Sequence, residues 1–461
     1  MPSGSARRPG FALLAVAAVF ILGLIRLIGF VQDNAVDLLF EDQWAFLTPM
    51  FKGEGPWASF EYQHGPHRLG LGGLIEWFLY RATGWDVRAD AWAAIVVLAV
   101  ATAAALVLAA RLRGRLSWSD AAFPLLLLGP LHWETMTFTP SLAHSIVPLA
   151  LVFLLACAWT LQRPAARVIA VGVCSTLVIF TGYGVCAAPA AAGLALLRGL
   201  RPPATSGTTE RWPAVLILLL LAGAVVAFAC GYHWDHGTSV TRPPALQWWD
   251  YPRFCALMYT SLLGFRSLSP LPTAAGAAVL GLVLGAFVSA AGRLWRREAD
   301  MRAGAVWLLT GTSLAYAALT ALGRLPINIE AAFMWRYMTL MTPGIGGVAL
   351  ALEWWGKKFG PAGRRGLMVG WVVLGGIIWA NFSPERNAAT IALGKRRWIA
   401  SYLQTRDLSR ANRESGYWVF FEAPDSPRIA EKLRWLEQRH LSFFRTTDGY
   451  GREKTPPVSP R

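Results

Sequence analysis

Long apolar stretches separated by short polar ones run along most of the chain. A helix needs roughly 20 residues to cross the hydrocarbon core of a bilayer, which is about 30 Å thick. About eleven stretches approach this length, so the pattern predicts an all-α polytopic membrane protein. The predicted spans cover 11–31, 91–111, 119–132, 142–161, 166–182, 183–198, 212–231, 271–292, 303–322, 338–355 and 366–382. Residues 165–200 also fit one long kinked stretch, although the turn sequence from Thr181 to Gly184 favours two spans.

The basic residues indicate which loops face the cytoplasm, because short cytoplasmic loops are rich in Lys and Arg. With a cytoplasmic N-terminus, every inward segment is basic: these segments hold Arg7, Arg8, Arg111, Arg113, Arg115, Arg163, Arg167, Arg198, Arg201, Arg211, Arg293, Arg296, Arg297, Arg302, Lys357, Lys358, Arg364 and Arg365. The short outward loops 133–141, 181–184 and 323–337 hold only Arg324 and Arg336. We therefore expect the C-terminus outside, and the first span to remain as an uncleaved anchor.

This orientation divides the chain into two regions. A transmembrane domain covers 1–382, with long outer segments at 32–90 and 232–270, and a small outer region covers 383–461. In that tail we expect a strand over 417–421, a helix starting with Ser426 and Pro427, and disorder from Thr446 onward. The tail holds fifteen Lys and Arg, but long segments translocate largely regardless of charge. Nothing in its sequence indicates catalysis.

Composition supports the membrane class and narrows the choice of partners. Hydrophobic residues make up 55% of the chain and charged residues 15%, whereas soluble domains carry about 25% charged residues. The net charge of +16 comes from basic residues in short loops between apolar runs, so no nucleic-acid partner is expected. The five cysteines have no paired spacing, which argues against both a disulfide framework and a thiolate zinc site.

The first outer segment carries the most suggestive polar residues. Residues 33–51 predict an amphipathic interfacial helix with an acidic stripe formed by Asp33, Asp37 and Glu41. Asp42 falls instead on the border of the apolar face, beside Trp44, where partial desolvation would raise its pKa. A plain solvated face is the alternative for all four carboxylates. A second amphipathic run follows over 69–81.

Between these two runs lies the sequence Glu61-Tyr62-Gln63-His64-Gly65-Pro66-His67-Arg68. His64 and His67 with a nearby carboxylate are ligand types that bind divalent metals. The intervening Gly-Pro argues against a helical His pair, however, and no third ligand is fixed by spacing. We therefore favour hydrogen bonding to a polar ligand, with Arg68 available for a phosphate, and keep a divalent metal as the alternative.

The predicted topology and several short motifs resemble the GT-C glycosyltransferase superfamily, closest to its uncharacterised bacterial members. The motifs are Glu41-Asp42-Gln43-Trp44, the cluster from His64 to Arg68, the run 69–81, Gly323-Arg324 and Trp335-Arg336-Tyr337. The resemblance implies transfer of a sugar from a polyprenyl-phosphate donor to an envelope glycan or lipid acceptor. It places the chain in a bacterial inner membrane, with the reaction and the C-terminus on the periplasmic side.

This chemistry needs a base for the acceptor hydroxyl and cations for the departing phosphate. Asp42 is the first candidate for the base, and Glu41 is the second. Arg336, Arg324 and Tyr337 are candidates for holding the phosphate, because guanidinium binds phosphate oxygens in a fork. Arg26 is a further candidate cation, with snorkelling to the surface as its alternative. Trp44 is a candidate for stacking on the sugar.

Two other functions compete with the enzyme. A transporter of polyprenyl lipids or polysaccharides should show internal repeats or charged, broken helices at mid-membrane, and the sequence shows neither. A non-catalytic GT-C-like scaffold that only binds the lipid would use the same arginines, so the sequence does not separate it from the enzyme.

The predicted topology can be tested with a reporter that is active only outside the cytoplasm. We expect activity when the reporter is fused after residue 461 or after residue 58, and none after residue 206. A cytoplasmic C-terminus would mean an even number of spans and would remove the main support for the resemblance.

Overall fold

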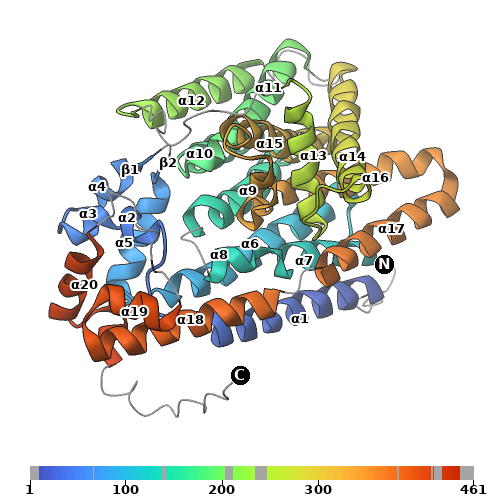
Figure 1. Cartoon of the computed structure of the whole chain (residues 1–461). Coiled ribbons are helices and arrows are strands. Elements are labelled where there is room, and N and C mark those ends of the chain that lie inside the picture. The colour runs from blue at the N-terminus through green and yellow to red at the C-terminus, as the bar shows by residue number, and fades with distance from the viewer. Residues whose placement is uncertain are drawn as a thin grey trace, which may run out of the picture.

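A computed structural model describes residues 10–65, 67–137, 142–202, 211–233, 247–298, 300–381, 384–416, 419 and 428–446. Helices dominate, and the described strands form one two-stranded hairpin. The helices of the bundle are α1 (Phe11–Asn34), α6 (Arg88–Arg113), α7 (Ala122–Leu127), α8 (Trp133–Thr137), α9 (Val147–Trp159), α10 (Pro164–Ile179), α11 (Ala187–Leu200), α12 (Arg211–Ala229), α13 (Asp250–Leu262), α14 (Pro270–Trp295), α15 (Met301–Arg324), α16 (Thr342–Lys358) and α17 (Gly360–Asn381). Figure 1 shows them as one tilted bundle.

Smaller elements complete the fold. The first outer segment forms α2 (Gln43–Phe46), α3 (Thr48–Phe51), α4 (Pro56–Glu61), β1 (Gln63–His64), β2 (His67–Arg68) and α5 (Leu71–Ala82). The tail forms α18 (Pro384–Thr405), α19 (Leu408–Ser415) and α20 (Ile429–Gln438). Single turns include η1 (Trp118–Ala121), η2 (Pro130–His132), the π-turn η3 (Leu142–Ile146), η4 (Tyr183–Cys186), η6 (Ile329–Phe333), η7 (Trp335–Tyr337), η8 (Thr339–Met341) and η9 (Ser442–Thr446).

The multi-pass membrane class is confirmed at the level of its helices. In the described part of the chain, eight helical stretches are long and apolar enough to cross a membrane, and Pro164–Ile179 is a shorter apolar helix. The predicted span 119–132 is broken into η1, the six-residue α7 and η2, with Gly129 and Pro130 at the last break. The total of eleven stays a prediction.

The predicted helix over 33–51 is wrong. Helix α1 continues to Asn34, the chain is then non-helical to Phe40, and two four-residue helices follow. Glu41 has a left-handed φ of 52°, which interrupts any continuous helix there. Because the helix does not form, the acidic stripe does not form either: Asp33 is exposed, whereas Asp37 is buried.

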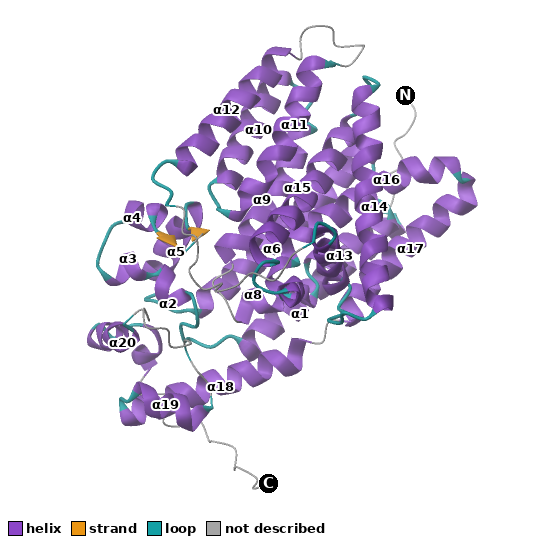
Figure 2. Ribbon diagram, turned by 45° about the horizontal axis from the view of Figure 1, so that its top comes forward, coloured by secondary structure: helices purple, strands orange, loops and turns teal. Residues whose placement is uncertain are grey.

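The tail and the first outer segment share one apolar core. This core is separate from the large core of the bundle and draws residues from both segments. Its members, which we call the shared core, include Val36, Leu38, Leu39, Trp44, Leu47, Tyr80 and Trp85 from the first segment, and Trp398, Ile399, Tyr402, Leu433, Leu436, Phe443 and Phe444 from the tail. In Figures 1 and 2 the tail helices lie against α2–α5 at one end of the bundle. We call it the outer end, following the predicted orientation.

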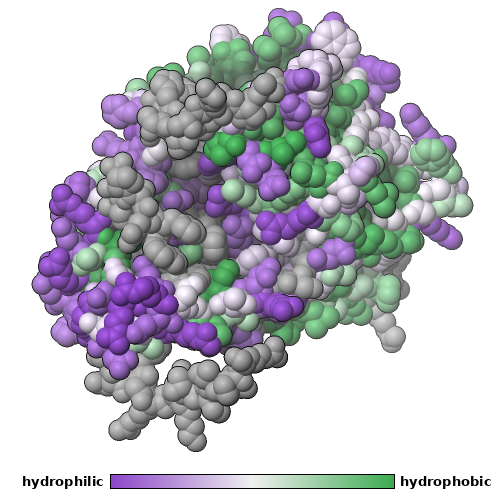
Figure 3. Space-filling view, in the orientation of Figure 1, coloured by the Kyte–Doolittle hydropathy of each residue, from purple (hydrophilic) through white to green (hydrophobic). Residues whose placement is uncertain are grey.

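The tail was predicted to be a small α/β module, and its described part is helical. The predicted apolar face of α20 is confirmed, because Ile429, Leu433 and Leu436 are buried. Within the described residues α20 begins at Ile429, while the predicted helix start at Ser426 and Pro427 lies outside them. The predicted strand over 417–421 also lies outside them, apart from Val419. Hydrophilic side chains cover this end of the molecule in Figure 3, and apolar ones cover much of the rest of that view.

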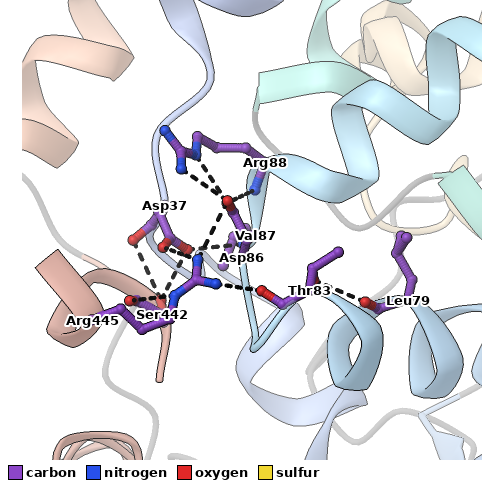
Figure 4. A network of polar contacts seen from close by, with 8 residues as sticks. All are labelled: Asp37, Leu79, Thr83, Asp86, Val87, Arg88, Ser442 and Arg445. Atoms are coloured by element: carbon purple, nitrogen blue, oxygen red, sulfur yellow. Dashed lines mark hydrogen bonds and ion pairs between the residues drawn. The ribbon is translucent and has the colours of Figure 1, made fainter. Parts of the chain in front are cut away.

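A buried polar network fixes the tail to the first segment (Figure 4). Asp37 Oδ1 accepts hydrogen bonds from the Val87 amide at 2.8 Å and from Ser442 Oγ at 3.0 Å. Arg445 pairs with Asp37 at 3.4 Å and with Asp86 at 3.3 Å. Burial, followed by the charge of Asp86, raises the pKa of Asp37 to about 6. Because these donors oppose the rise in pKa, they stabilise the ionised form of Asp37 at neutral pH.

Replacing Asp37 by Ala should loosen the tail. The change leaves the Val87 amide and the Ser442 hydroxyl without their acceptor and leaves Arg445 with Asp86 alone. The expected cost is about 1–3 kcal/mol. We expect a lower thermal unfolding midpoint in detergent and faster proteolysis of α18–α20. Asp33→Ala is the matched control, because Asp33 is exposed. Equal stability of the two variants would show that the Asp37 network does not hold the tail.

Candidate functional site

Charged and aromatic side chains from several outward segments meet at the outer end. They come from the 40–43 turn, the β1–β2 hairpin, α8, η7 and α18. We call Glu41, Asp42, His64, Glu134, Arg336 and Lys395 the outer-end site. Sequence motifs pointed to Glu41, Asp42, His64 and Arg336, and these residues now stand beside two groups, Glu134 and Lys395, that come from other parts of the chain.

The turn that carries the two acidic residues is held at both ends. Gln43 accepts a hydrogen bond from the Phe40 amide at 2.9 Å and donates to Asp90 at 3.4 Å. The Glu41 amide donates to the Val419 carbonyl at 3.0 Å, which ties the turn to the tail. A non-glycine residue in the left-handed region is costly, and such residues cluster at functional sites. The fold thus fixes Glu41 in an unfavourable conformation through contacts on both sides.

Glu41 is the acidic residue of the outer-end site whose pKa lies near neutrality. Burial, followed by the charge of Asp42, raises the pKa of Glu41 to about 7, and the charges of Arg336 and Lys395 oppose this rise. Its Oε1 is buried and has no hydrogen-bond partner among the described residues. A carboxylate with a pKa near neutrality can both accept and return a proton at physiological pH.

Asp42 does not have the environment predicted for it. The prediction placed it in a desolvated pocket, but its side chain is 48% exposed. Its Oδ1 lies 3.9 Å from His64 Nε2, and the His64 ring packs edge-on against Phe46, which also contacts His144. Of the two adjacent carboxylates, Glu41 is the one whose pKa is raised by burial.

Lys395 reaches this site from the tail, and sequence reasoning missed it. It is buried, and its Nζ donates to the Thr137 carbonyl at 2.8 Å. Among the described residues it makes no ion pair within 4 Å. A usable signal was present, because Lys395 lies on the apolar face of α18 between Ala392 and Trp398, which are both buried. A charged residue on such a face calls for a functional or structural reason.

Arg336 stands in η7 with aromatic residues around it. Its amide donates to Glu134 Oε2 at 3.0 Å, while its guanidinium lies 5.7 Å from the Tyr337 ring centre and contacts Met334 Sδ at 3.1 Å. In the described part of the chain no carboxylate lies within ion-pair distance of this guanidinium. The charge of Glu134 still acts on the guanidinium, so an anionic ligand at Arg336 would share it with that carboxylate.

Glu134 and Arg266 extend the same cluster. Burial raises the pKa of Glu134, and the charges of Arg336 and Arg266 oppose that shift. Arg266 lies 5.2 Å from the Trp335 ring centre, and Trp335 in turn packs edge-on against Trp133 at 5.7 Å. Two guanidinium groups and two indoles thus gather around one buried carboxylate.

Other predicted site residues have structural partners. The Arg68 guanidinium donates to the Phe228 and Cys230 carbonyls, so it clamps the hairpin to the end of α12. Arg26 pairs with Glu385 and lies 4.8 Å from the Trp379 ring centre, which joins α1 to α18. Arg324 interacts with Tyr183. Arg68, Arg26 and Arg324, which were predicted to bind phosphate, therefore have partners within the protein. Among the predicted cations, Arg336 is the remaining candidate for a phosphate ligand.

Trp44 is not available to a sugar. Its ring is fully buried in the shared core and stacks on Phe51 with ring centres 6.2 Å apart. Tyr337 is buried beside Arg336. His67 pairs with His64 in the hairpin backbone, and its side chain lies outside the described residues. Neither Trp44 nor Tyr337 therefore offers an exposed ring face to a sugar.

The described residues provide an incomplete set of ligands for the divalent metal considered from the sequence. His64 and Asp42 approach each other, but no group of three or more His, Cys, Asp or Glu side chains suited to a metal occurs in the ranges the structure describes. The divalent metal therefore stays an alternative without a complete ligand set.

Comparison with the models of known protein families gives no match to this chain, and comparison with curated protein sequences gives none either. The functional assignment therefore rests on the geometry of the outer-end site.

Proposed function

We propose that the chain is a membrane-embedded glycosyltransferase that takes a sugar from a polyprenyl-phosphate donor at the outer face of a bacterial inner membrane. The observation that carries the proposal is that Glu41, with its raised pKa, lies within electrostatic reach of Arg336, whose guanidinium makes no ion pair within 4 Å among the described residues. A base and a guanidinium near each other at one end of a helix bundle are what transfer from a lipid phosphate requires.

In the proposed reaction an acceptor hydroxyl attacks the anomeric carbon of the donor sugar. The new bond joins the acceptor oxygen to that carbon, and the bond from the carbon to the phosphate oxygen breaks. The polyprenyl phosphate leaves with the electron pair, and the hydroxyl proton passes to the Glu41 carboxylate. Glu41 acts in place of Asp42 because desolvation brings its pKa near neutrality.

The cations act on the departing phosphate. Arg336 carries a fork of N–H donors that makes no ion pair within 4 Å among the described residues, and Arg266 lies 5.2 Å from the Trp335 ring centre. Preorganised donors aimed at developing charge are worth more in a water-poor site than in solution. Burial lowers the pKa of Lys395 to about 7, and in its protonated form its charge opposes the rise in the pKa of Glu41.

A non-catalytic lipid-binding scaffold is the second candidate, and the two make different demands on Glu41. Binding of a lipid phosphate needs Arg336 but gains nothing from a nearby carboxylate, since like charges repel. A half-buried Glu41 carboxylate within electrostatic reach of the Arg336 guanidinium therefore favours the enzyme over the scaffold.

The proposal predicts a split between binding and turnover. Glu41→Gln keeps the size of the side chain but removes the proton acceptor, so turnover should fall by roughly two to four orders of magnitude while polyprenyl-phosphate binding is kept. Arg336→Ala should weaken binding, and Arg336→Lys should restore it only in part. Surface glycans of a deletion strain, complemented with each variant, would be measured by mass spectrometry, and polyprenyl phosphate would serve as the probe for purified protein.

Asp33→Asn is the control for charge removal, since Asp33 is exposed, and Asp42→Asn separates the two candidate bases. Full complementation by Glu41→Gln together with failure of Asp42→Asn would return the catalytic role to Asp42. Unchanged surface glycans in the deletion strain would contradict the enzyme itself, and retained binding by wild type would then favour the scaffold.

A further inference from the structure

A basic pocket lies at the opposite end of the bundle from the outer-end site. It has a volume of about 610 Å³ and is lined by Arg115, Ser117, Trp118, Gly356, Lys357, Gly360, Pro361, Arg364, Arg365 and Met368. The lining comes from the loop after α6, the end of α16 and the start of α17. Four of the ten lining residues are cations and none is acidic. We propose that this pocket binds the headgroup of an anionic phospholipid.

The nearest acidic residues do not neutralise the pocket, because they are already shared among buried arginines. Glu353 pairs with Arg113 at 2.9 Å and with Arg302 at 3.1 Å, and Asp120 pairs with Arg113 at 2.7 Å. Arg364 lies 3.7 Å from the same Glu353 carboxylate. The excess positive charge therefore faces the open space of the pocket and favours an anion.

An apolar stripe favours a lipid over a soluble phosphate. Arg365 lines the pocket, and Val369, Val373 and Ile377 follow it at four-residue spacing on the same face of α17. These three side chains are 50%, 52% and 42% exposed. Acyl chains of a lipid held at Arg365 can lie along this stripe, and Trp118 at the rim is a typical interfacial residue. The same surface offers nothing to a water-soluble anion.

The pocket is distinct from the proposed donor site. Helix α6 runs from Arg88, two residues before the Asp90 that bonds to Gln43 at the outer end, to Arg113 beside the pocket. The two sites therefore lie at opposite ends of a 26-residue helix. This inference does not depend on the proposed glycosyltransferase activity.

The test is lipid binding by the purified full-length chain, measured by native mass spectrometry with phosphatidylglycerol and with phosphatidylcholine. Wild type should bind phosphatidylglycerol in preference. The triple variant Arg115→Gln, Lys357→Gln, Arg365→Gln should lose at least about tenfold in its phosphatidylglycerol affinity, since each basic residue near an anionic lipid contributes severalfold. The single variant Arg365→Gln gives a smaller loss and covers the case in which the triple variant fails to fold.

The control removes three exposed cations that do not line the pocket, Arg163, Arg296 and Lys358, by the same change to Gln. It should keep the wild-type affinity. Equal losses in both triple variants, or equal binding of phosphatidylcholine, would overturn the proposal. Displacement of the lipid by millimolar inorganic phosphate would also overturn it, in favour of a soluble phosphate ligand.

Discussion

The outer end of this protein depends on burial of one apolar core that belongs to two segments at opposite ends of the chain. Several helices of the two segments are short: α2 and α3 have four residues each, and α19 has eight. Packed together, they bury Trp44, Trp398 and Phe443 almost completely. Isolated short helices are unstable in water, so each set forms because the other covers its apolar face.

This shared core also places the chemistry. The Glu41 amide donates to the Val419 carbonyl of the tail, and Gln43 accepts a hydrogen bond from the Phe40 amide in the same turn. Lys395 of α18 contributes a side chain to the site. The tail was expected to be a cover with no part in the site. Instead it sets the backbone of one acidic residue and contributes a cation that acts on that residue's pKa. The candidate site is therefore composite, and the local sequence motifs do not reveal Lys395, which comes from α18.

The parts of the fold that the sequence predicted correctly are those set by local periodicity. In the described part of the chain eight helical stretches have membrane length and apolarity, although 119–132 is broken into short pieces. The run 69–81 became α5, and the apolar face of α20 is buried as expected. Asp37 shows where this reasoning fails. A helical wheel is valid only for a helix. Residues 35–40 are not helical, and their apolar side chains pack against a tail that is distant in sequence. Similarly, the sequence does not show that Arg26 forms an ion pair with Glu385, because the two residues are far apart in the chain.

The central claim is that the tail packs against the first outer segment. Cross-linking in intact membranes tests this claim most directly. Asp86 and Arg445 approach to 3.3 Å, so the double variant Asp86→Cys, Arg445→Cys should be joined by a short thiol-specific cross-linker. Mass spectrometry should then find a peptide pair from the two segments within one chain, and neither single variant should give it. Absence of that pair in the double variant, with both cysteines shown to be modified, would contradict a tail docked on the first outer segment.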